Sequence, residues 1–104
     1  MPEQKPSVGR IVHYRLTQLD VDVINRLRAD AMKHLPAHQE HADGTQIHVG
    51  NSVAAGDVYP LVITRVWNEH GVNGQVLLDG NDTYWATSRV EGDEPGQWQW
   101  PPRV

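Results

Sequence analysis

The sequence predicts an α+β fold that is mainly β: a small, SH3-like, partly open antiparallel β-barrel with one helix inserted after its first strand. Three observations predict it. Five short β-prone segments recur at close spacing, one helical pattern follows the first of them, and turn signals separate the later ones. The 104 residues are enough for one hydrophobic core. We therefore expect a single domain over residues 10–104, preceded by a flexible arm of residues 1–9.

The first strand is predicted over residues 10–16, where alternation places three apolar side chains on one face, Val12, Tyr14 and Leu16. Thr17 then begins the helix. The sequence Thr-Gln-Leu-Asp matches a capping box in which Asp20 replaces the usual Glu, so the Thr17 hydroxyl is expected to accept from the Asp20 amide.

The helix carries one apolar stripe, made of Val23, Ile24, Leu27 and Ala31. Pro36 is expected to end it near Leu35, because proline cannot continue a helix. Residues 36–58 show little periodicity, apart from a short extended piece at residues 46–49.

A three-stranded meander is predicted next. Residues 59–67 form a nearly continuous apolar run, which is typical of a strand covered on both faces. Residues 72–78 return, and residues 79–82, Asp-Gly-Asn-Asp, form a tight hairpin connection to a third strand at 83–90. The predicted inward set is Val62, Val76, Leu78, Tyr84 and Ala86.

The tryptophans are the most informative residues, because the chain has four Trp and three Tyr but no Phe. Any of these rings could replace Phe in the core. Trp98 and Trp100, two apart in a short final strand, are expected on one face. Trp67 ends its strand beside a turn. Trp85 shares its predicted face with polar residues, so we expect it to be the exposed ring, a stacking platform with Arg89 nearby.

A polar pocket is a second candidate site. His13 lies on the first strand, and His48 and Asn51 lie in a loop that must fold back over the barrel. With Arg15 or Arg89, these side chains could line a small pocket at one mouth of the barrel. The alternative is that His48 and Asn51 only bond local backbone.

Other classes of site find little support. Without Cys there is no disulfide or thiolate ligand, no Ser-His-Asp grouping suggests itself, and the glycines at 71 and 74 precede a strand rather than a helix. We therefore expect no enzyme and no cofactor. His34, His38 and His41 are interrupted by Pro36, so we expect no metal.

The charge and hydropathy of the chain argue against some classes of partner. The net charge is −4, with six bases against four acids up to residue 35 and three bases against nine acids after it. Such an acidic chain is not expected to bind nucleic acid. There is no membrane-spanning run and no signal-peptide pattern, so a cytoplasmic location is expected.

Three stretches together resemble a group of small uncharacterised proteins of tailed bacteriophages and prophages: Val-Gly-Arg-Ile-Val-His-Tyr at 8–14, Ile-His-Val-Gly-Asn-Ser at 47–52 continuing through Ala-Gly-Asp-Val-Tyr-Pro at 55–60, and the segments 78–88 and 95–101. Members of the group often end in Trp-His-Trp-Pro, where this chain has Gln99 between its tryptophans. The resemblance implies a phage setting, so that the expected cytoplasm is that of a host bacterium, and it supplies no activity.

Three functions follow as hypotheses. The first is a non-enzymatic phage or prophage accessory protein that acts as a small protein-binding module, with a host or phage protein as its partner. The second is a minor virion or assembly component that self-associates. The third is a protein that sequesters a small anionic ligand such as a nucleotide, with stacking on Trp and charge from Arg15 or Arg89.

Overall fold

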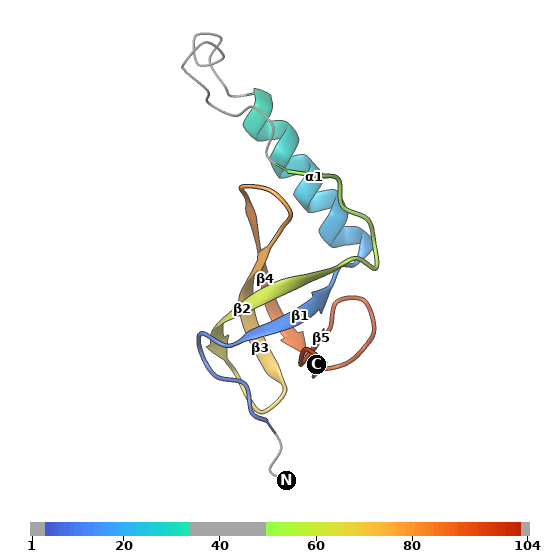
Figure 1. Cartoon of the computed structure of the whole chain (residues 1–104). Helices are drawn as coiled ribbons and strands as arrows, with labels where there is room; N and C mark the ends of the chain where they lie inside the picture. Colours follow the sequence, from blue (N-terminus) through green and yellow to red (C-terminus); the bar gives the residue numbers. More distant parts are fainter. Residues whose placement is uncertain (1–3, 34–49, 103–104) are drawn as a thin grey trace.

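The computed structural model describes residues 4–33 and 50–102, which form a curled antiparallel sheet with one helix (Figure 1). The elements in chain order are β1 (Ile11–Arg15), α1 (Gln18–Lys33), β2 (Val58–Val66), β3 (Gly71–Leu77), β4 (Thr83–Val90) and β5 (Trp98–Gln99). The strand order across the sheet is β4-β3-β2-β1-β5. The mainly β, α+β class is confirmed. The extended piece predicted at 46–49, the helix end near Leu35 and His48 lie outside the described residues.

Two β-bulges curl this sheet into a half-barrel. Between Ile63 and Arg65, β2 contains one residue more than β3, and β4 contains one residue more than β3 between Ala86 and Arg89. Bulges of this kind bend the bulged strand and increase its twist. The curl is completed by a bridge between Glu91, just after β4, and Trp98 of β5.

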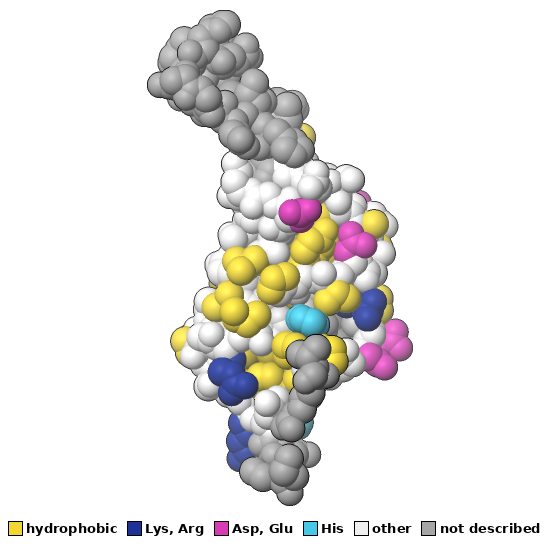
Figure 2. Space-filling view, viewed as in Figure 1, with side chains coloured by type: hydrophobic (Ala, Val, Ile, Leu, Met, Phe, Trp, Pro, Cys, Tyr) yellow, Lys and Arg dark blue, Asp and Glu magenta, His cyan; other side chains and the backbone are white. Residues whose placement is uncertain are grey.

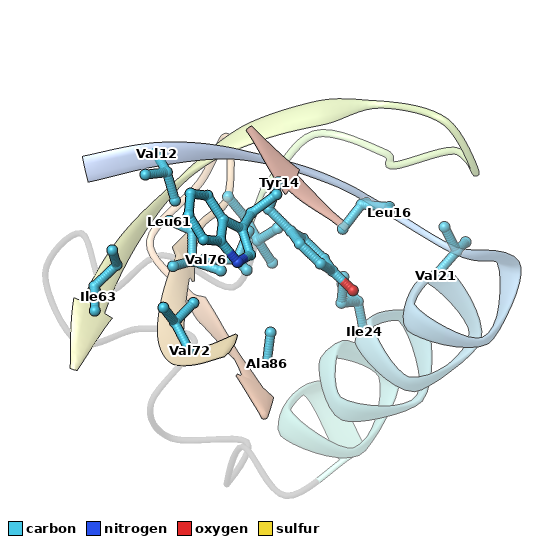
Figure 3. Packing of buried hydrophobic residues seen from close by; sticks show 12 residues of the cluster. Val12, Tyr14, Leu16, Val21, Ile24, Leu61, Ile63, Val72, Val76 and Ala86 are labelled. Carbon is cyan, nitrogen blue, oxygen red and sulfur yellow. The ribbon is translucent and has the colours of Figure 1, made fainter. Parts of the chain in front are cut away.

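The core lies inside the curl, and α1 covers its open side (Figure 3). The face of β1 predicted to point inward does so, and the buried set is Val12, Tyr14, Leu16, Val21, Ile24, Leu61, Ile63, Val72, Val76, Leu78, Ala86 and Trp98. Only the first half of the helix packs on this core. Of the predicted apolar stripe, Ile24 is buried and Val23 half-buried, whereas Leu27 and Ala31 are exposed, because the inward side of the helix runs through Asp20, Val21, Ile24 and Arg28 instead. Beyond that, the helix projects away from the sheet (Figure 1).

One member of the predicted inward set is wrong. Val62 faces outward, and its neighbours Leu61 and Ile63 are the buried residues of β2. Because β2 is apolar on both faces, its sequence does not reveal which face is inside. The pairing with β1 decides this, since Leu61 lies opposite Val12, whereas Val62 lies opposite the exposed Ile11. The remaining predicted members, Val76, Leu78, Tyr84 and Ala86, do pack in or against the core.

Candidate functional site: the outer face of the sheet

A row of four side chains crosses the convex side of the sheet. Direct pairing places Ile11 opposite Val62, Val62 opposite Gln75, and Gln75 opposite Trp85, so all four point to the same side. The two ends of the row are the most open, with Ile11 51% and Trp85 61% exposed. The exposure predicted for Trp85 is therefore confirmed. The row continues through the Gln75 amide on β3 to the aliphatic side chains of Val62 on β2 and Ile11 on β1.

Neighbouring positions extend the row into a surface, which we call the outer face. Its further members are His13, opposite Pro60; Leu77, opposite Thr83; and Val58, opposite Arg15. Val58, Pro60 and Leu77 are all exposed. No carboxylate occurs among the described residues of this face. Figure 2 shows hydrophobic side chains gathered over the strands, with charged side chains around the margin.

A small hollow of about 220 Å³ borders the outer face. It lies between β1 and the segment leading into β5, and its lining is His13, Arg15, Val58, Gly92, Asp93, Gln97, Gln99 and Pro102. Arg15 is not free here, because its Nη1 donates to the Gly56 carbonyl at 2.9 Å. The predicted proximity of His13 and Arg15 is thus present.

Asn51 does not join that hollow. Its side-chain amide donates to the Asp79 carboxylate at 2.8 Å, and its backbone N–H donates to the Asp79 carbonyl at the same distance. Its own carbonyl accepts from Arg28. Arg28 also makes a two-point bond to Asp82, which ties α1 to the β3–β4 connection. Asn51 therefore holds the loop against the hairpin through a partner 28 positions away, and not through local backbone as the alternative interpretation expected.

The other tryptophans serve the fold. Trp98 is fully buried, and its indole N–H donates to the carbonyls of His70 and Arg89. Trp100 is half-buried and packs edge-on against Trp98 at 5.6 Å, with the Arg10 guanidinium 4.9 Å from its ring centre. Neither ring belongs to the outer face.

Trp67 is half-exposed but also engaged. Its indole N–H donates to the Asn73 side-chain oxygen at 2.9 Å, and the Arg65 guanidinium lies 4.0 Å from its ring centre. The same Asn73 oxygen accepts from the Ser88 backbone N–H. Trp67 thus helps to hold Asn73, the β3 residue that lies at the register shifts with both β2 and β4.

Arg89 is not beside Trp85. Strand alternation predicts both on one face, but the bulge in β4, with Ser88 at φ +56°, reverses the alternation before Arg89. The Arg89 side chain turns inward instead and donates to the buried Asp20 carboxylate at 3.2 Å. The predicted pairing of Trp85 and Arg89 in one site is therefore wrong.

Asp20 is the centre of a buried polar cluster. It accepts from the Tyr14 hydroxyl at 2.6 Å, from the Tyr84 hydroxyl at 2.7 Å and from the Thr17 backbone N–H at 2.9 Å. The Asp20 N–H donates back to the Thr17 hydroxyl, so the predicted capping box is confirmed. Every oxygen of the carboxylate is occupied, which leaves no free base for chemistry.

Burial alone would raise the pKa of Asp20. The hydrogen bonds from Thr17, Tyr14 and Tyr84 and the charge of Arg89 outweigh it, so the pKa of Asp20 lies below its usual value. Burial and the Asp20 charge raise the pKa of Tyr84 to about 12 and that of Tyr14 further. These groups keep one protonation state at neutral pH, as a structural cluster requires.

A larger hollow, of about 720 Å³, opens at the other end of the molecule beside Trp100. Four ionisable side chains that line it contact one another, Lys5 with Glu69 at 3.6 Å and His70 with Glu91 at 3.1 Å. Each of these four residues therefore already has a partner within the protein.

Two kinds of feature, a metal-ligand cluster and a membrane-spanning helix, were sought in the part of the chain that the structure describes. Residues 4–33 and 50–102 contain no group of three His, Asp or Glu side chains placed to hold a metal ion. His34, His38 and His41 lie outside those ranges. Within the described chain, α1 is too short and too polar to cross a membrane.

Comparison with known proteins leaves the site to be interpreted from its own geometry. No protein-family model, no curated protein and no solved structure matches the chain.

Sequence reasoning found Trp85 but missed the surface around it. Ile11, Val62 and Leu77 join the tryptophan only through strand pairing, which the sequence does not specify. A signal was present, however. The nearly continuous apolar run of β2 predicted cover on both faces, and in a single chain the outer side of β2, with Val58 and Pro60, remains open.

Proposed function

We propose that this protein is a non-enzymatic protein-binding module that docks its partner on the outer face, with Trp85 as the anchor. The observation that carries this proposal is the in-register row from Ile11 to Trp85. It places an exposed indole at the end of a row that continues through Gln75 to the aliphatic Val62 and Ile11, while a different tryptophan, Trp98, fills the core. Exposed apolar surface of this kind is typical of interaction sites, and Trp is enriched among residues that dominate binding energy.

A protein suits this face better than a small molecule does. Its side chains extend over four strands without enclosing a cavity, whereas small-molecule sites are concave and bury most of their ligand. The cation expected beside Trp85 is absent, because Arg89 is bonded to Asp20. A nucleotide that stacked on Trp85 would therefore find no counter-charge from that residue.

The same proposal includes where the protein acts and on which kind of partner. The resemblance to phage and prophage proteins supports an accessory protein that acts in the bacterial cytoplasm on a host or phage protein. The half-barrel of five strands is compatible with an SH3-like architecture, in which the sheet supplies a rigid platform for such contacts.

The hollow beside the outer face supports a second candidate, the binding of a small anion. His13 and Arg15 both line it, although Asp93 does too. Thermal unfolding with and without nucleotides or inorganic phosphate tests this candidate, because a ligand that binds only the folded state must raise the melting temperature.

Affinity capture from bacterial lysate tests the main proposal when three proteins are compared: the wild type, Trp85→Thr and Leu19→Gln. Thr keeps a β-branched side chain on the strand, and Leu19 is an exposed apolar residue of α1 away from the outer face. We expect a partner that the wild type and Leu19→Gln retain and Trp85→Thr loses, with all three equally folded. A captured set that Trp85→Thr leaves unchanged would contradict the proposal.

A further inference from the structure

We infer that the partner protein presents an acidic segment to the sheet, with a carboxylate that bonds Arg65 while an apolar residue of the same segment covers Trp85. This inference rests on the proposed function, because it names the chemistry of the partner that Trp85 anchors. The position of Arg65, the way its side chain is held and the charges around it argue for it.

Arg65 lies on the same side of the sheet as Trp85. In the register of β2 with β3 it is opposite Asn73, and Asn73 and Gln75 are two positions apart on β3, so their side chains share one side of that strand. Gln75 is in turn opposite Trp85. Two strand spacings of about 4.8 Å and two residue steps of about 3.4 Å separate Arg65 from Trp85, which gives about 12 Å along the sheet. An extended segment covers that distance in about four residues.

The Arg65 side chain is held in place by stacking. Its guanidinium lies 4.0 Å from the centre of the Trp67 ring. The indole N–H of Trp67 donates to the Asn73 side-chain oxygen at 2.9 Å, and the same oxygen accepts from the Ser88 N–H at 2.6 Å, so the ring is itself fixed to the sheet. A guanidinium stacked on an indole directs its N–H groups outward from its edge, where a carboxylate can accept two of them. Because the side chain is already ordered, it loses less entropy when it binds.

The charge of Arg65 has no carboxylate partner among the described residues. Its side chain is exposed, and none of the ion pairs within residues 4–33 and 50–102 includes it. The outer face adds the guanidinium of Arg15, whereas the described acids lie on α1 and in turns and loops. This side of the sheet is therefore cationic in a chain whose net charge is −4, and its electrostatic complement is a surface that brings a carboxylate.

Two other kinds of partner fit this charge pattern less well. A basic segment would meet Arg65 with a like charge. Nucleic acid depends for its affinity on contacts with many phosphates, and two guanidiniums in a chain with acidic loops supply few. A carboxylate close to an apolar residue matches what this side of the sheet offers, which is one ordered guanidinium and one exposed indole.

Selection of peptides from a random display library tests this inference, with the full chain as the bait. The selection is run on the wild type, on Arg65→Gln and on Arg26→Gln, which removes an exposed arginine of α1 and serves as the matched control. We expect the wild type and Arg26→Gln to select peptides enriched in Asp or Glu together with large apolar residues. Arg65→Gln should select peptides without the acidic enrichment.

Three measurements on the strongest wild-type peptide complete the test. Arg65→Gln should weaken its binding about tenfold and Arg26→Gln should not, because only the first change removes a charged hydrogen bond. Replacing the acidic residue of the peptide by its amide should cause a similar loss with the wild type and no further loss with Arg65→Gln. Raising NaCl from about 0.02 M to about 0.5 M should weaken binding to the wild type, because salt screens the attraction between opposite charges.

Other results would overturn the inference. They are a wild type that selects basic or uncharged peptides, an acidic enrichment that survives Arg65→Gln, or binding that strengthens as salt is added. Failure of this inference can be distinguished from failure of the proposed function. Peptides without an acidic residue that bind the wild type but not Trp85→Thr exclude the acidic partner and leave the protein-binding module in place. Peptides that bind the wild type and Trp85→Thr equally contradict both.

Discussion

Asp20 connects three separate parts of the chain through one side chain. It caps the start of α1 through Thr17, and it accepts from Tyr14 of β1 and from Tyr84 and Arg89 of β4. The local part of this arrangement was predictable, because a capping box needs only four consecutive residues. The tyrosine and arginine partners were not, since two of them lie 64 and 69 positions away.

Asp20→Asn should therefore destabilise the fold strongly. The amide cannot accept the same hydrogen bonds and leaves Arg89 without its counter-charge, so we expect a loss of about 3 kcal/mol in the free energy of unfolding. Asp22→Asn is the matched control, because Asp22 is exposed and its one hydrogen bond among the described side chains comes from Gln18 of the same helix. Urea unfolding at pH 7 measures both. Similar losses of unfolding free energy in the two variants would show that the buried cluster stabilises the fold no more than an exposed helix residue does.

The same cluster predicts how stability depends on pH. The pKa of Asp20 is lowered on folding, so its contribution is present above the unfolded value of about 4 and is lost as pH falls through the folded value. The pKa of Tyr84 is raised to about 12, so its contribution is present below about pH 10 and is lost between about pH 10 and 12.

Unfolding free energies measured against pH should show both effects. Asp20→Asn should decline less steeply in acid than the wild type, and Tyr84→Phe should decline less steeply in alkali. Parallel curves for the wild type and Asp20→Asn below pH 5 would contradict the assignment of the acid effect to Asp20.

The bulge in β4 decides, among the elements, which side chains reach which face. Ser88 adopts φ +56°, and its N–H donates to the Asn73 side chain, so the strand gains a residue before Arg89. Sequence alternation could place Trp85 and Ala86 correctly because they precede this point. It failed at Arg89, because nothing in Thr-Ser-Arg marks a bulge that depends on a partner fifteen residues away.

Substitution at Ser88 tests this interpretation of the bulge. Ser88→Gly should leave stability unchanged or raise it by up to about 1 kcal/mol, because glycine adopts positive φ without steric cost. Ser88→Val should lower it by about 1–2 kcal/mol, because a β-branched residue is disfavoured there. Ser88 is exposed, so neither change disturbs the core. Thermal unfolding separates the two, and a more stable Ser88→Val would contradict the positive φ.

At the scale of the whole molecule, the fold class and the strand extents were predictable because they depend on local pattern. Capping, turn residues and period-two alternation each act over a few positions. The outer face was not predictable, because it exists only once β1, β2, β3 and β4 are in register. Val62 illustrates the limit: its sequence context is equally apolar on either side, and only pairing with Ile11 and Gln75 directs it outward.

The central claim is that two tryptophans have different roles, one in folding and one in binding. Trp98 is buried in the core and Trp85 is exposed, and we propose that Trp85 is kept exposed to bind a partner. The most direct test is the difference in unfolding free energy between the wild type and Trp85→Thr, measured at a protein concentration low enough to keep both monomeric. The account predicts a difference within about 0.5 kcal/mol, as for an exposed residue that supports binding rather than folding. A loss of about 2 kcal/mol or more would show that the ring stabilises the domain itself, and would contradict its role as the anchor of a docking face.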